Sequence, residues 1–149
     1  MINKIKEFIN KLYELNATPN EIAYGFAIGA FLGVFPTFGV GTLLAICVCA
    51  IFRLNYIAAI AGSFIIMNPL TTPFFWLLSA GVGGLIFSKD TKAIILEIKS
   101  GKVFASLGEI TVIYIVGSLI VSVIVGVISY FIVKGIFERR QKKVTNNKN

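Results

Sequence analysis

Polar residues that could bind a ligand gather around two proline-centred interruptions of an otherwise apolar chain, residues 35–39 and 68–73. A helix that restarts after a break has unpaired N–H groups and the positive end of its dipole, and both favour anions. The expected chemistry is therefore hydrogen bonding to an anion. The candidate binding residues in or near the interruptions are Pro36, Thr37, Gly39, Thr42, Arg53, Asn55, Asn68, Pro69, Thr71 and Thr72.

Residue types that carry catalysis are missing from the same region. The chain has no histidine, and residues 22–87 include no Asp or Glu, so general acid–base pairs and the usual metal ligands are lacking there. No phosphate-binding loop and no nucleophile elbow occurs. Cys47 and Cys49 are two residues apart and point to different sides of a helix, which argues against a disulfide or a shared metal. We expect no catalytic residues, no metal, no cofactor and no enzymatic activity.

The elements around these residues are predicted to be membrane helices. The 149 residues are 56% hydrophobic and 14% charged, whereas soluble domains are about 25% charged. Arg53 is the one charged residue between positions 22 and 87, and residues 110–133 carry no charge. Such runs exceed the roughly 20 residues that cross a bilayer, and they lack the alternation of barrel strands. The sequence predicts an all-α membrane protein.

Two successive segments, 19–52 and 55–87, each contain one interruption. Thr18, Pro19 and Glu21 form a capping-box pattern that starts the first helix. From position 22 to the first interruption there are only about 14 residues, or roughly 21 Å of helix, which is too short to cross. Each segment is therefore either a re-entrant hairpin or a single crossing interrupted at the midplane. The sequence does not choose between these alternatives.

The other segments complete a membrane domain of residues 17–135. Residues 1–16 are predicted to form an amphipathic surface helix, 88–108 a connecting loop with a short surface helix, and 109–134 a C-terminal transmembrane helix. Small residues four apart predict close helix packing. They are Gly25, Gly29 and Gly33 in the first segment, and Ser118, Ser122 and Gly126 in the last helix.

Basic residues near both ends predict the orientation. The net charge is +7, and residues 136–149 form a basic tail. Basic flanks usually mark the cytoplasmic side, so we expect a multi-pass inner-membrane protein with both termini in the cytoplasm. That requires an even number of crossings, for example one re-entrant hairpin, one interrupted crossing and the final helix. No nucleic-acid recognition module accompanies the basic tail, so no nucleic-acid partner is expected.

Three motifs in order carry a resemblance to a known family. They are the stretch 25–39 ending in Phe-Pro-Thr-Phe-Gly, then Arg-Leu-Asn at 53–55, and Asn-Pro-Leu-Thr-Thr-Pro at 68–73. Residues 17–135 thereby resemble the bacterial membrane family catalogued as domain of unknown function 2062. The resemblance implies a prokaryotic inner-membrane protein, joined to a glycosyltransferase in some longer relatives, and it implies no particular activity.

The function expected from these features is transport. Paired half-helix ends without core carboxylates favour a transporter or flippase for an anionic lipid or solute, such as a polyprenyl phosphate or an anionic phospholipid. Membrane lipids are then the partners, and the chain is expected to form homo-oligomers. Two alternatives stay open. One is a non-catalytic membrane scaffold or subunit of a complex, in which the polar residues only satisfy broken backbone, and the other is an oligomeric channel.

Overall fold

The computed structural model describes residues 17–37, 39–87 and 103–146. These parts of the chain are helical and contain no strand, as the fold-class prediction requires. The described helices are α2 (Pro19–Val34), α3 (Gly41–Ile51), α4 (Tyr56–Ile66), α5 (Thr72–Phe87) and α7 (Val103–Asn146). Helix α2 ends before Pro36, and the gap between α4 and α5 contains Pro69, so both apolar segments consist of two helices.

Helix α2 begins with the hydrogen bonds that its sequence predicts. The backbone N–H of Thr18 donates to Oε2 of Glu21 over 2.9 Å, and the N–H of Glu21 donates to Oγ1 of Thr18 over 3.3 Å. Pro19 occupies the first turn, where its missing N–H is not needed. These contacts involve residues close in sequence, so they fix the start of α2 without help from the rest of the fold.

The first three described helices form a small up-down-up bundle. Gly25 of α2 lies against the carbonyl of Asn55, Gly29 against that of Ala59, and Gly33 against the side chain of Ile66. Residue numbers rise together on the two helices, so α2 and α4 run parallel. Helix α3 returns in the opposite direction and packs its buried face on them. That face is formed by Ala45 and Cys49, which cluster with Ala59, Ile28, Leu32 and Leu54.

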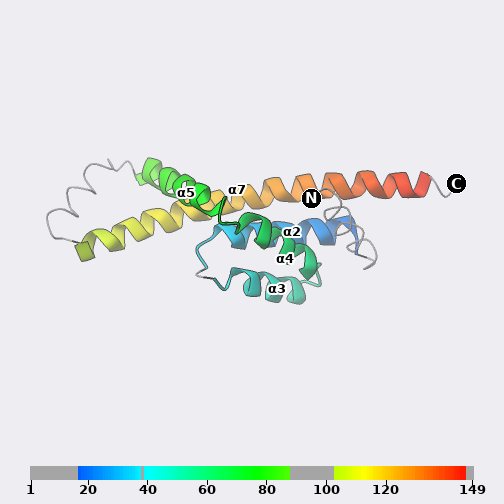
Figure 1. Ribbon diagram of the computed structural model, residues 1–149, viewed down its shortest axis with the longest axis horizontal. Helices are drawn as coiled ribbons and strands as arrows, with labels where there is room; N and C mark the ends of the chain where they lie inside the picture. Colours follow the sequence, from blue (N-terminus) through cyan, green and yellow to red (C-terminus); the bar gives the residue numbers. More distant parts are fainter. Residues whose placement is uncertain (1–16, 38, 88–102, 147–149) are drawn as a thin grey trace.

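The long helix α7 runs antiparallel to α2 and to α5, which occupy different parts of its length (Figure 1). Beside α2, Tyr130 pairs with Tyr24 and Gly126 lies near Phe31. Beside α5, Gly117 lies against the carbonyl of Ser79, and the contact of Gly83 with Ile113 follows further along. Since α4 is parallel to α2, helices α4 and α5 run in the same direction, one after the other.

Helix α7 extends beyond the predicted span at both ends. The sequence prediction placed a loop up to residue 108 and a tail from residue 136, whereas α7 starts at Val103 and continues to Asn146. The C-terminal extension lacks Pro, its residues are mostly good helix formers, and Lys134 pairs with Glu138 one turn on at 3.9 Å. The predicted surface helix at 1–16, and the predicted loop up to residue 102, lie outside the described residues.

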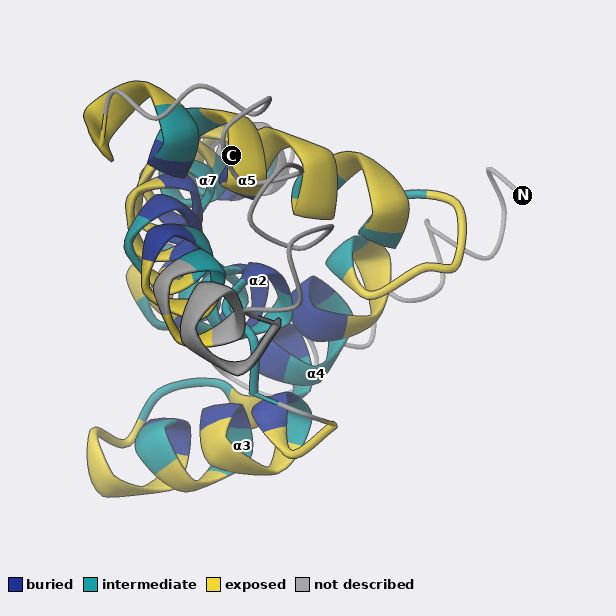
Figure 2. Cartoon of the chain, turned by 90° about the vertical axis from the view of Figure 1, so that its left-hand side faces the viewer, coloured by how far each residue is buried: buried dark blue, intermediate teal, exposed yellow. Residues whose placement is uncertain are grey.

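Apolar side chains cover much of the outer surface. Figure 2 shows α5 mostly exposed and α3 with its exposed face turned away from the other helices. In α5 the buried residues are Ser79 and Gly83. Within α7, Ile110–Gln141 is long and apolar enough to cross a membrane by length and composition, and it is the one such helix among the described residues.

Candidate functional site

The first interruption, between α2 and α3, is a tight turn. The N–H of Thr37 donates to the carbonyl of Phe35 over 2.8 Å, and the N–H of Val40 donates to the carbonyl of Thr37 over 3.1 Å. The Thr37 hydroxyl lies 3.5 Å from the carbonyl of Leu32, at the limit of a hydrogen bond. Gly39 has φ +91°, a conformation that favours glycine. The glycine therefore allows the chain to reverse and start α3.

The first turn of α3 is left without a side-chain cap. Its N-cap residue is Val40, and no side chain among the described residues accepts a hydrogen bond from the amides of this turn. An α-helix begins with N–H groups that have no partner within the helix. Thr42 is in the same turn and is half-buried. The start of α3 therefore has no side-chain cap, and the Thr37 hydroxyl and the carbonyl of Leu32 lie against the buried Gly41.

The second interruption, between α4 and α5, satisfies its own polar groups. Asn68 Oδ1 accepts from the N–H of Leu70 over 3.2 Å. The Thr71 hydroxyl donates to the carbonyl of Ile66 over 2.6 Å, and the Thr72 hydroxyl donates to that of Asn68 over 2.9 Å. The N–H groups of Thr71 and Thr72 also donate to the Asn68 carbonyl. These side chains therefore act as local caps, which leaves less of this turn available to a ligand.

The two interruptions lie at the same level along the molecule (Figure 1). Gly33, at the end of α2, touches Ile66, at the end of α4. Gly126 of α7 contacts α2, and Gly117 of α7 contacts α5. Counting residues along α2 and α5 from these contacts places both interruptions beside the middle of the apolar part of α7. The turn residues Pro36, Thr37, Gly39, Asn68, Pro69, Thr71 and Thr72, with Thr42 at the start of α3, lie in this zone.

Arg53 and Asn55 lie at the opposite end of the bundle. They form the turn between α3 and α4, and the 11 residues of α4 separate this turn from the second interruption by roughly 16 Å. Asn55 Oδ1 accepts from the N–H of Ala58 over 2.9 Å and caps α4. Arg53 is exposed, with φ +53°. The structure therefore does not bring this cation to the interruptions.

Several buried small residues form the helix contacts. Gly25, Gly29 and Gly33 all lie on the face of α2 that meets α4, and Gly126 lies on the face of α7 that meets α2. Ser118 and Ser122 are fully buried, and their hydroxyls donate to the carbonyls of Ile115 and Leu119.

Two buried serines were missed by the sequence analysis. The Ser63 hydroxyl donates to the carbonyl of Gly29 over 3.1 Å, which joins α4 to α2. The Ser79 hydroxyl, at the crossing of α5 and α7, has no hydrogen-bond partner in the described part of the chain. Ser79 and Gly83 are four residues apart, the same small-residue spacing as that of Gly25, Gly29 and Gly33, and this spacing is the signal in the sequence that could have found the contact.

The described residues contain no group of three or more His, Cys, Asp or Glu side chains that could hold a metal ion. The geometry is instead that of an all-helical protein with a candidate membrane helix and two interrupted segments beside it.

Residues 3–145 match the model of a family described as uncharacterized proteins conserved in bacteria, domain of unknown function 2062, and the chain belongs to that family. No curated protein and no solved structure matches the chain.

Proposed function

We propose that this chain is a multi-pass protein of the bacterial inner membrane. Long apolar side chains are exposed on α4, α5 and α7, among them Phe64, Leu77, Leu85 and Phe131, each at least 60% exposed. Soluble monomers rarely expose so much apolar surface, and such surface marks a contact with a membrane or with another protein. A lipid environment accounts for it, because lipid tails solvate these side chains.

The proposed topology follows the directions of the helices. Helices α2 and α3 enter and leave from one side as a re-entrant hairpin, α4 and α5 together cross as one interrupted helix, and α7 crosses back. The start of α2, the turn between α3 and α4, and the charged end of α7 are then on one side. That side carries Arg53, Arg139 and Arg140, so the positive-inside rule makes it cytoplasmic, together with both termini.

Within this topology, the function proposed is transport of an anionic lipid or solute. The observation that carries it is the uncapped first turn of α3, at the level of the middle of α7. In hydrocarbon an N–H without an acceptor costs several kcal/mol, so an acceptor from water, a partner or a substrate would stabilise any amide of this turn that has no backbone partner. An anionic phosphate or carboxylate fits these donors and the positive end of the helix dipole.

The proposal assigns the anion to α3 rather than to both interruptions equally. At the second interruption Asn68, Thr71 and Thr72 already hydrogen-bond to local backbone. Thr42 in the first turn, and Thr37 whose hydroxyl lies against Gly41, can add hydroxyls to the amides of α3. No catalytic step is included, and a transporter or flippase needs none.

A non-catalytic scaffold or subunit is the second candidate, and a specific observation favours it. The side-chain hydrogen bonds at the interruptions join a polar side chain to its own neighbouring backbone. Such bonds are what a purely structural break requires. In that case a partner protein, rather than a substrate, would supply the acceptor for the first turn of α3.

The decisive experiment places a negative charge at the start of α3. Thr42→Glu and the matched neutral variant Thr42→Gln are reconstituted in vesicles with a fluorescent anionic phospholipid, and lipid translocation is measured. The helix dipole favours a carboxylate at this N-terminus, and while ionised the carboxylate repels an anion there. We expect at least about a tenfold slower translocation for Thr42→Glu than for Thr42→Gln, since 1.4 kcal/mol of repulsion suffices.

Equal rates for the two variants, or no translocation by the wild type, would count against transport of this lipid. Co-purification of a stoichiometric partner protein in mild detergent, together with absent translocation, would favour the scaffold.

A further inference from the structure

We propose that Tyr24, Tyr130 and Lys134 form a binding site for the phosphate group of an anionic phospholipid in the cytoplasmic leaflet. This inference rests on the membrane position in the proposed function, but it concerns a different place from the start of α3. The three residues come from α2 and α7 and gather hydrogen-bond donors and a positive charge at one point of the surface.

The geometry joins the three side chains into one cluster. The Lys134 ammonium donates to the Tyr130 hydroxyl over 3.3 Å and lies 5.5 Å from the centre of the Tyr130 ring. The rings of Tyr24 and Tyr130 have centroids 4.6 Å apart. Because the Tyr130 oxygen accepts from the ammonium, the proton of this phenol can be donated to a further acceptor. A phosphate oxygen is such an acceptor, and the ammonium supplies the opposite charge.

The cluster is held on a well-packed base. Tyr130 packs against the buried core formed by Ile22, Ala23, Ala58, Val133 and Phe137. Its ring is therefore fixed between α2 and α7, while Tyr24 is 50% exposed and the Lys134 side chain is 33% exposed. The site is thus preorganised at its base and open to a ligand at its outer side.

The position on α7 matches the depth of a lipid phosphate. Lys134 is the first charged residue after the uncharged run 110–133, and Arg139 and Arg140 follow it. Phe131, 67% exposed, lies almost one turn before the lysine, and its ring centroid is 5.3 Å from that of Tyr130. Tyrosine and lysine at such a border are typical of the headgroup region. The exposed ring of Phe131 beside the cluster would contact acyl chains, which favours a phospholipid over free phosphate.

A competing partner for Lys134 is Glu138, whose carboxylate lies 3.9 Å away. This pair spans one turn of α7 and both side chains are partly exposed, so it is a weak interaction. A lipid phosphate in contact with the ammonium can displace it. Removal of the carboxylate, in Glu138→Gln, is therefore expected to strengthen lipid binding.

Native mass spectrometry of detergent-purified protein with added phosphatidylglycerol or phosphatidylcholine tests the site. The wild type should retain phosphatidylglycerol preferentially. Tyr130→Phe should lower the apparent affinity by about fivefold, the effect of one hydrogen bond, and Tyr24→Phe should lower it less. Lys134→Gln should lower it by about tenfold or more, and Lys134→Arg should keep most of it. Tyr56→Phe and Arg140→Gln are matched controls on the same side of the molecule and should leave it unchanged.

Unchanged retention in Tyr24→Phe, Tyr130→Phe and Lys134→Gln would overturn the inference. An equal loss in Arg140→Gln would also overturn it, because attraction would then come from the basic surface in general. Displacement of the lipid by millimolar inorganic phosphate would show that the cluster binds free phosphate. Cell fractionation separates this inference from the proposed function. Wild-type protein absent from the membrane fraction would contradict the proposed membrane position, whereas membrane-bound protein without selective lipid retention would contradict the lipid site alone.

Discussion

Helices α4 and α5 follow one another in the chain but are anchored very differently. Helix α4 packs on α2 and α3, and a hydrogen bond from Ser63 to Gly29 joins it to α2. Helix α5 packs mainly on α7, and its buried Ser79 hydroxyl has no partner in the described part of the chain. Both contacts use glycines to bring backbones together. The difference indicates that α2, α3 and α4 form a self-contained bundle. Beyond the second interruption, α5 is held mainly by its contact with α7.

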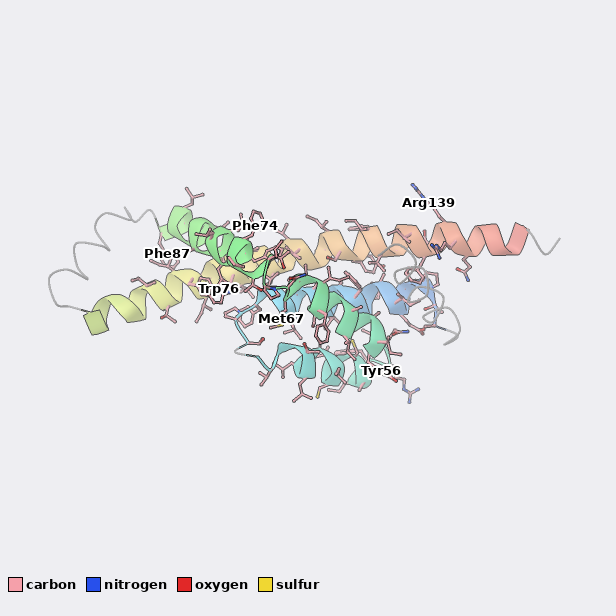
Figure 3. The ribbon with its side chains drawn as sticks, viewed as in Figure 1. Tyr56, Met67, Phe74, Trp76, Phe87 and Arg139 are labelled. Carbon is pink, nitrogen blue, oxygen red and sulfur yellow. The ribbon has the colours of Figure 1, made fainter. Side chains whose placement is uncertain are left out.

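The outer surface of α5 adds to this contrast. Phe74, Trp76 and Phe87 project from α5 in Figure 3, and all three are more than 40% exposed. In the bundle, by comparison, Ala23, Ala45, Ala58 and Ala59 are fully buried. Small buried side chains make the bundle stable by close contact, whereas the side chains of α5 depend on what surrounds the protein.

The largest expected effect is at the contact between α2 and α4. In Gly29→Ala the added Cβ would collide with the carbonyl of Ala59, and backbone cannot move aside as a flexible side chain does. We expect a loss of at least about 2 kcal/mol in the free energy of unfolding. The matched variant is Gly81→Ala in α5, where a Cβ meets nothing within 4 Å. Because Ala favours helix over Gly, Gly81→Ala should be neutral or more stable by up to about 1 kcal/mol.

Thermal unfolding followed by size-exclusion chromatography measures both variants in the same detergent. Equal midpoints for Gly29→Ala and Gly81→Ala would mean that the close approach of α2 and α4 does not hold the bundle together.

The next effect tests whether α5 can detach while the bundle stays folded. In Gly83→Ala the added Cβ would collide with the carbonyl of Ile113 in α7. We expect α5 to move away from α7, at a cost of about 1–3 kcal/mol to that contact. Spin labels at Gly84 and Gly108, both in open space, report the distance between the two helices. Labels at Asn20 and Leu43, exposed positions of α2 and α3, report the bundle.

Both pairs of spin labels are introduced into a variant in which Cys47 is replaced by serine and Cys49 by alanine. The expected result is a broad, longer distance for the first pair and an unchanged distance for the second. A change in both distances would show that α5 and the bundle unfold together. No change in either distance would show that the contact between α5 and α7 tolerates the added methyl group.

The same contrast explains which features of the fold and of the candidate site the sequence predicts and which it does not. The start of α2 was predicted in detail because Thr18 and Glu21 interact within one turn. The spacing of Gly25, Gly29 and Gly33 indicated a contact face but not its partner, since the pairing with α4 depends on the chain reversing through Gly39 and α3. Arg53 was grouped with the interruptions because it is close in sequence. The parallel course of α2 and α4 instead places it one helix length away.

The smallest effect compares the two buried serine hydroxyls. Ser63→Ala removes the hydrogen bond to the Gly29 carbonyl, and we expect a loss of about 0.5–1 kcal/mol in unfolding free energy. Ser79→Ala removes a hydroxyl that has no partner in the described part of the chain, so no bond is lost and the variant should be neutral or slightly more stable. Unfolding midpoints in detergent give both values, and the hydroxyl-to-hydrogen change is the same in each. A destabilised Ser79→Ala would show that this hydroxyl has an acceptor outside the described part of the chain. The contact of α5 with α7 would then be only one of the interactions that hold α5 in place.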